Sequence, residues 1–274
     1  MTIACINQKR LAHMGWGLLL AGALLLHHIS TKTFAAEPRQ WPVELSVGRF
    51  QIHSDFDVTT AAVLSPELTQ LSQDVHSVLG IGSGDSPVHI VLFQSAHEYQ
   101  RYMHNYFPQL PARRALYIQD RGPGMLFAHW HVDVATDLRH EITHALLNDG
   151  APPLPLWLDE GIAEYFEVER GRRFDGSDYL ALVRQRSGQG IVPSLAELEK
   201  VSDLQQFQAP HYRDSWSWVH FLLHRSAATR QLLVGYLAGH RSGTQQLPLS
   251  RQLQQLSPGL NDDFRAHFQA LSAP

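Results

Sequence analysis

The segment His140-Glu141-Ile142-Thr143-His144 places two histidines and a glutamate at a spacing suited to metal chemistry. Helical residues four apart share one face, about 6 Å apart, so His140 and His144 can both present a ring nitrogen to one Zn²⁺ ion. Glu141 is then turned aside, toward a water molecule on the metal. Zinc lowers the pKa of such a water to about 7, and a neighbouring carboxylate can take its proton during attack on a carbonyl. The same five residues also fit an amphipathic helix with two surface histidines.

A third ligand is available downstream, where Glu160 and Glu164 lie one turn apart on a predicted helix. A catalytic zinc uses three protein ligands plus water, and two histidines with one glutamate are an established set. The fifteen residues between His144 and Glu160 are enough to reverse the chain and set two helices antiparallel. One glutamate is then the ligand, and the other accepts the second N–H of a ligating histidine. Gly161 would let this helix approach a neighbour closely.

The stretch that follows Pro155 resembles the gluzincin metallopeptidases, whose zinc is held by two histidines and a downstream glutamate. Trp157-Leu158-Asp159-Glu160-Gly161-Ile162-Ala163 is similar to the Trp-Leu-x-Glu-Gly-x-Ala stretch of the alanyl aminopeptidase family. That resemblance implies Glu160 as the ligand, and the thermolysin pattern implies Glu164 as the support of a zinc-bound histidine. The match extends to Tyr165 in the small bacterial peptidase-MA-like branch. It implies a zincin, thermolysin-like catalytic architecture with one zinc ion.

A second segment, residues 211–223, resembles the helix of these aminopeptidases that begins with a tyrosine. The resemblance implies that the Tyr212 hydroxyl steadies the oxyanion of the reaction. A donor aimed at developing negative charge can be worth about 3 kcal/mol. His211 is the alternative donor.

The upstream half lacks the Gly-x-Met-Glu-Asn strand that holds a substrate's amino terminus in the aminopeptidases; Gly122-Pro123-Gly124-Met125-Leu126 has no such glutamate. The departure favours an endopeptidase over an exopeptidase. Residues 126–132 are predicted to form an edge strand that pairs with an extended peptide through main-chain hydrogen bonds. His129 and His131 are two residues apart and therefore share one face of this strand. Their side chains could be exposed, line the cleft or bind a second metal.

The first 36 residues have the layout of a secretory signal. Lys9 and Arg10 precede an apolar run from Met14 to Leu26, and small residues follow at a plausible cleavage point. The protein is therefore expected to be exported, periplasmic or secreted, with anchoring by residues 14–29 as the alternative. The single cysteine, Cys5, lies in this segment, so a mature chain has no disulfide and must bind metal through histidine and carboxylate.

Composition argues against a nucleic-acid partner. The chain has 274 residues with 22 basic and 26 acidic side chains, a net charge of −4, and residues 37–274 alone carry 19 basic and 26 acidic ones. No positive field would attract a phosphate backbone. The expected partner is a peptide or protein substrate, with a membrane only if the N-terminal segment is uncleaved.

An α+β fold is expected, with a small mixed sheet and helices followed by a mainly helical half. The predicted units are residues 1–36 (signal or anchor), 37–132 (strand-rich) and 133–274 (helical, carrying the zinc site). Alternation and short apolar runs predict strands, and helical spacing and capping signals predict helices. The expected strands cover residues 43–56, 88–93, 115–118 and 125–132; the expected helices cover 59–79, 96–106, 136–148, 156–169, 179–186, 194–200, 212–224, 229–239 and 262–271.

These observations predict an exported zinc metallopeptidase that hydrolyses peptide bonds. An alternative is a zinc-bearing envelope peptide-binding or assembly factor that holds an extended chain without cutting it. A structural zinc site is the third possibility, but such sites normally use four protein ligands, and the motif indicates no fourth.

Overall fold

The computed structural model describes residues 6–7, 41–57, 64–82, 84–119 and 122–271. These residues include a mixed sheet in the order β1-β5-β6-β4-β3-β2. Strands β3, β4 and β6 are mutually parallel, β2 and β5 run antiparallel to β3 and β6, and β1 is parallel to β5. The strands are β1 (Ile6–Asn7), β2 (Val43–Val47), β3 (Phe50–Ser54), β4 (Val88–Phe93), β5 (Ala115–Gln119) and β6 (Gly124–His129).

The described helices are α2 (Ser65–Leu79), α3 (Ala96–Tyr106), α4 (Val134–Leu147), α5 (Leu156–Glu167), α6 (Leu180–Gly188), α7 (Leu195–Leu198), α8 (Ala209–His224), α9 (Ala227–Arg241), α10 (Leu249–Leu256) and α11 (Leu260–Ala270), with 3₁₀ turns η2 (Arg170–Arg172) and η3 (Leu204–Gln206). Helix α2 lies between β3 and β4 in the chain and α3 between β4 and β5, and the elements described after β6 are all helical. The mixed sheet and its helices agree with the α+β class at this coarse level.

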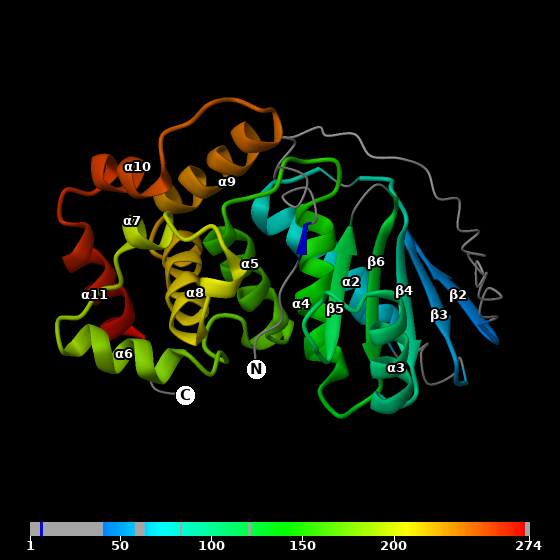
Figure 1. Ribbon diagram of the computed structural model, residues 1–274. Coiled ribbons are helices and arrows are strands. Elements are labelled where there is room, and N and C mark those ends of the chain that lie inside the picture. The colour runs from blue at the N-terminus through cyan, green and yellow to red at the C-terminus, as the bar shows by residue number, and fades with distance from the viewer. Residues whose placement is uncertain (1–5, 8–40, 58–63, 83, 120–121, 272–274) are drawn as a thin grey trace, which may run out of the picture.

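Helices cover both faces of the sheet (Figure 1). On one face, alternate strand residues such as Ile52, Ile90 and Leu126 share a core with α2 and α4. On the other face, Val91 and Phe127 share a smaller core with Tyr99 of α3. Because both faces are covered, the central strands are apolar almost throughout. Helix α4 also packs against α5, and α5 against α8, so α4 lies between the sheet and the helical half (Figure 1).

Two strand predictions differ from the structure. The single strand expected over residues 43–56 is a hairpin of β2 and β3, because Gly48 turns the chain with φ of 56°. The edge strand expected over residues 126–132 was wrong, since β6 ends at His129 and lies between β4 and β5. Strand β5 instead lies next to α4, with only the two residues of β1 on its outer side among the described residues.

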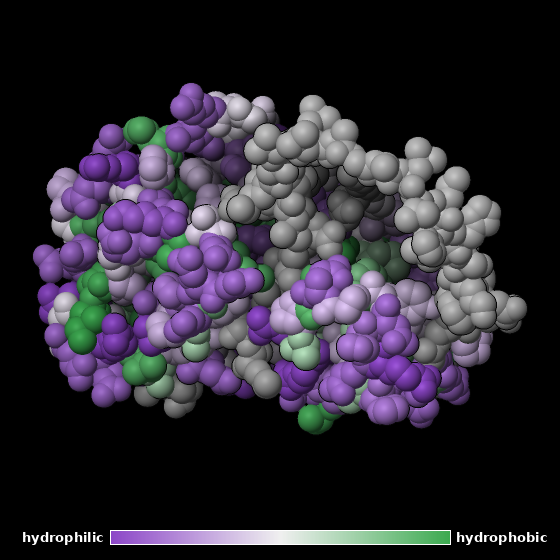
Figure 2. Space-filling model, in the orientation of Figure 1, coloured by the Kyte–Doolittle hydropathy of each residue, from purple (hydrophilic) through white to green (hydrophobic). Residues whose placement is uncertain are grey.

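Among the coloured residues of the face shown in Figure 2, hydrophilic ones predominate. Among the described residues, no helix combines the length and apolar character needed to cross a membrane. The expected signal or anchor, residues 1–36, lies outside the described residues except for Ile6 and Asn7.

A cluster of histidines in the helical half predicts acid sensitivity. The His220 and His267 rings are hydrogen-bonded at 3.0 Å, and His224 accepts from or donates to the Tyr165 hydroxyl at 2.9 Å. Burial lowers the pKa of His220 to about 3, and the pKa values of His224 and His267 to about 4. These rings are therefore neutral in the folded protein at pH 7 but have ordinary pKa values near 6.5 in the unfolded chain.

These neutral rings make their full contribution to the free energy of unfolding above about pH 6.5. The free energy of unfolding then decreases as the pH falls toward 4. The decrease is on the order of 1.4 kcal/mol for each unit by which the pKa of a fully buried ring is lowered in the folded state. Urea unfolding at pH 7, 5.5 and 4.5 should show this loss. The substitution His220→Gln should flatten the pH dependence, whereas the exposed control His97→Gln should not. Equal slopes in both variants would contradict the assignment to the cluster.

Candidate metal centre

Helices α4 and α5 bring three of the predicted ligands together. The His140 and His144 rings lie on one face of α4 with centroids 4.9 Å apart. The Oε2 atom of Glu160, on α5, lies 3.5 Å from Nε2 of His140 and 3.7 Å from Nε2 of His144. All three residues are at most 1% exposed, and their ligand atoms lie within 4.8 Å of one another. The buried set of His140, His144 and Glu160 could hold a metal ion.

Local sequence explains why the two helices meet. Helix α4 ends where Asn148 donates to the His144 carbonyl through both its backbone N–H and its side-chain amide. Gly150, with φ of 64°, and three prolines follow before α5 begins at Leu156. On the far side of α5, a Cβ at position 161 would lie 2.7 Å from the Ser215 backbone oxygen. Gly161 therefore lets α5 approach α8 closely, which holds Glu160 in the interior.

Several polar atoms of Glu160 and His144 make no hydrogen bond among the described residues. Within the described part of the chain, both carboxylate oxygens of Glu160 and Nε2 of His144 are buried without a hydrogen bond. Leaving a buried polar group unsatisfied costs about 1–3 kcal/mol, and more for a charged one. Two imidazoles and a carboxylate are an established ligand set for zinc. The donor set and its missing hydrogen bonds both fit a bound cation.

Two further carboxylates hold the histidine rings in place. Glu167 Oε2 lies 2.9 Å from His140 Nδ1, and Asp159 Oδ2 lies 3.1 Å from His144 Nδ1. These partners fix which ring nitrogen carries a proton and leave Nε2 for a metal. Although burial opposes it, the neighbouring carboxylates raise the pKa of both His140 and His144.

Glu164 occupies a different place from the one expected. The carboxylate against His140 Nδ1 is Glu167, one turn further along α5. Glu164 is 3% exposed and lies beside Glu167 and Tyr179, and burial together with the charge of Glu167 raises its pKa well above the usual value. Glu164 therefore adjoins the carboxylate that supports His140 instead of being that support.

Removing either support should weaken metal binding without removing a ligand. We expect Asp159→Ala and Glu167→Ala each to lower zinc affinity by about 10- to 100-fold, because the ligating ring loses its orientation. Competition with a chromophoric chelator measures the change. The exposed Glu169→Ala, just beyond α5, is the matched control and should retain wild-type affinity. Wild-type affinity in both support variants would show that these contacts do not orient the ligands.

Glu141 faces the edge of the sheet rather than joining the ligand set. Its Oε2 accepts a 2.6 Å hydrogen bond from the backbone N–H of Tyr117 in β5, whereas its Oε1 is buried without a hydrogen bond in the described structure. Burial raises the pKa of Glu141 to about 7, with the two histidines opposing the rise. A carboxyl group with a pKa near neutrality can both accept and donate a proton.

Tyr212 and His211 lie in the first turn of α8. Tyr212 is buried, with its ring edge-on to Phe207 at 4.6 Å. Burial raises its pKa, and the negative charge of Glu160 acts in the same direction. His211 is occupied otherwise: its Nδ1 accepts the backbone N–H of Gln208 at 2.9 Å and caps the helix. Of the two expected donors, Tyr212 is the one whose side chain is not committed to the helix cap.

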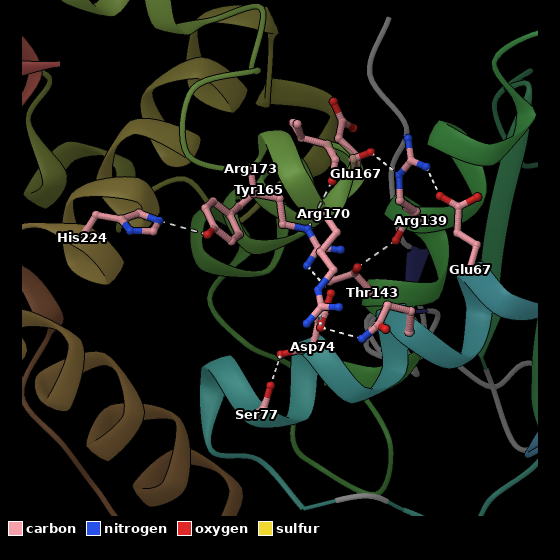
Figure 3. A network of polar contacts seen from close by, with 12 residues as sticks. Glu67, Asp74, Ser77, Arg139, Thr143, Tyr165, Glu167, Arg170, Arg173 and His224 are labelled. Atoms are coloured by element: carbon pink, nitrogen blue, oxygen red, sulfur yellow. Dashed lines mark hydrogen bonds and ion pairs between the residues drawn. The ribbon is translucent and has the colours of Figure 1, made fainter. Parts of the chain in front are cut away.

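A network of polar contacts fastens α2 to the two metal-site helices (Figure 3). Arg139, next to His140, pairs with Glu67 of α2 and donates to the backbone oxygen of Glu167. Arg173 donates to Asp74 of α2 at 2.6 Å. Because Arg139 contacts the backbone of Glu167, it helps to hold the end of α5 beside His140.

The two expected histidines of the preceding strand lie apart from the ligand set. His131 Nε2 lies 3.0 Å from Asp137 in the first turn of α4, and the His129 ring contacts the His131 ring in a tilted arrangement, with centroids 4.8 Å apart. Among the described residues, the only groupings with the geometry to hold a metal involve His140, either with His144 and Glu160 or with Glu164 and Glu167. A second metal at His129 and His131 therefore gains no support.

No protein-family model matches the chain, and no curated protein is significantly similar to it.

Proposed function

We propose that the protein is an exported, zinc-dependent metallopeptidase of the gluzincin kind with a zincin architecture, and that it cleaves within peptide chains. One observation carries the proposal: two imidazoles and a carboxylate from different helices converge, buried, with Glu160 oxygens that have no hydrogen-bond partner in the described residues. A proton-accepting glutamate follows the first of these ligands directly, as hydrolysis requires.

Each residue of the site then has a chemical role. His140, His144 and Glu160 would hold one zinc ion, which supplies a Lewis acid that polarises a carbonyl and lowers the pKa of water. Glu141 accepts the proton of the attacking water and passes it to the leaving amine, a use for a pKa near 7. Tyr212 donates to the developing oxyanion. Asp159 and Glu167 keep both imidazoles oriented throughout.

The position of β5 supports an extended peptide as the substrate. This strand lies beside α4 and reaches Glu141 through the Tyr117 N–H. A peptide added along an edge strand is held by main-chain hydrogen bonds irrespective of its termini. This mode of binding leads to cleavage within a chain. It agrees with the absence of the glutamate that holds a substrate's amino terminus in the aminopeptidases.

Digestion of denatured casein tests the proposal. Residues 37–274, loaded with one equivalent of zinc, should produce fragments that vanish when a chelator is added and return when zinc is restored. Fragments that persist in the chelator would overturn the metal dependence. A stable complex with casein and no cleavage would favour the peptide-binding alternative.

A further inference from the structure

A small cavity of about 120 Å³ lies between α3 and the loop that leads into β5. Apolar and aromatic side chains such as Tyr99, Met103, Phe107 and Leu110 form much of its wall, and the polar side chains of Gln100, His104 and Arg113 also line it. We call it the α3–β5 pocket. Several of its apolar residues also pack against the core on the α3 face of the sheet, so the wall is anchored to the fold.

Aromatic and polar contacts connect this pocket to the first turns of α4. The Tyr99 ring lies 5.6 Å from the His129 ring, which lies 4.8 Å from the His131 ring. His131 Nε2 lies 3.0 Å from Asp137, one turn before Glu141. Burial raises the pKa of Tyr99, and the negative charges of Glu141 and Asp137 raise it further. One wall of the pocket is therefore linked, through two ring contacts and the His131–Asp137 contact, to the first turn of α4, the helix that carries Glu141.

The loop side of the pocket leads to the other half of the site. Arg113, which lines the pocket, lies two residues before β5. Tyr117, in the middle of β5, donates its N–H to Glu141. Strand β1 pairs with the last two residues of β5, at the end away from the pocket. A peptide along the first half of β5 would thus pass between the pocket and Glu141.

We propose that the α3–β5 pocket binds a side chain of the peptide substrate close to the scissile bond and selects medium-sized apolar side chains such as leucine or methionine. The proposal rests on the proposed peptidase function. The apolar part of the wall favours an apolar occupant, and the cavity volume of about 120 Å³ is of the order of one medium-sized side chain. Burying such a side chain in place of glycine is worth about 10- to 100-fold in kcat/KM.

Ala112 provides a way to fill the pocket without touching the core. It lines the cavity and is exposed on the loop, so Ala112→Trp places a large ring in the space that the substrate would use. The matched control is Ala228→Trp, at an exposed position on α9.

Cleavage sites in denatured casein, mapped by mass spectrometry, should show leucine or methionine enriched at one position relative to the scissile bond. Ala112→Trp should abolish this enrichment and lower kcat/KM at those sites about 10-fold or more, with unchanged zinc content. Ala228→Trp should leave both unchanged.

A wild-type preference that survives in Ala112→Trp would overturn the proposal, as would wild-type cleavage without any apolar preference. A measurement of peptide binding distinguishes failure of the pocket proposal from failure of the proposed peptidase function. The ligands are fluorescein-labelled alanine-serine nonapeptides with one central leucine or glycine. They are titrated with two zinc-loaded proteins that both carry Glu141→Gln, one with and one without Ala112→Trp. Tighter binding of the leucine peptide, lost on adding Ala112→Trp, supports the pocket even if the wild type cleaves nothing. Equal binding of both peptides overturns it.

Discussion

The substitution Glu141→Gln is expected to lower the rate of peptide hydrolysis by about 10³-fold while the protein keeps its zinc and its fold. Glutamine has nearly the same shape and can still face the Tyr117 N–H with its carbonyl oxygen, but it cannot accept a proton. Glu141 is not one of the converging ligands, so the metal should remain bound. Steady-state cleavage of casein, zinc analysis and thermal unfolding measure the three quantities.

The control for this experiment is Glu44→Gln, a glutamate on β2 whose side chain is 70% exposed. It should cleave casein at the wild-type rate. Undiminished turnover by zinc-loaded Glu141→Gln would defeat the role of Glu141 as the proton acceptor.

Replacing Glu160 by glutamine should have the largest effect on metal binding, a loss of more than about 100-fold in zinc affinity together with loss of hydrolysis. The neutral amide replaces a carboxylate whose oxygen faces Nε2 of both histidines. Loss of a direct ligand should exceed the 10- to 100-fold cost of removing a supporting contact. Zinc affinity is measured by competition with a chelator.

Glu164→Gln is the matched comparison, since both residues are buried on α5 one turn apart. It should cost less affinity than Glu160→Gln, because Glu164 contacts Glu167 and Tyr179. The reverse ranking would favour the competing assignment with Glu164 as the ligand.

The ligand helices were the most predictable part of the molecule. His140 and His144 belong to one helix, so their common face follows from helical spacing alone, and a second helix with buried acids was evident from its apolar pattern. Which acid supports which ring depends on how α5 is rotated against α4. That rotation is set by Gly161 packing on α8 and by Arg139 holding the end of α5. The supports Asp159 and Glu167 were therefore missed, although Glu160, Glu164 and Glu167 form a visible stripe along α5.

The order of the strands could not be predicted from local pattern. Strand β6 has the alternation and length that an edge strand could also have, and its interior place depends on pairing with β4, more than thirty residues earlier. Helix α10 was also missed, because it is short and follows a proline, although Leu249, Leu253 and Leu256 have helical spacing. Loop closure and distant pairing, rather than residue propensity, decide these features.

Zinc K-edge X-ray absorption on residues 37–274 purified with one equivalent of zinc tests the central claim most directly. Convergence of His140, His144 and Glu160 predicts one zinc per chain with two imidazole nitrogens at about 2.0–2.1 Å, one carboxylate oxygen and one exchangeable water. A substoichiometric metal content, or four protein ligands with no exchangeable water, would contradict it.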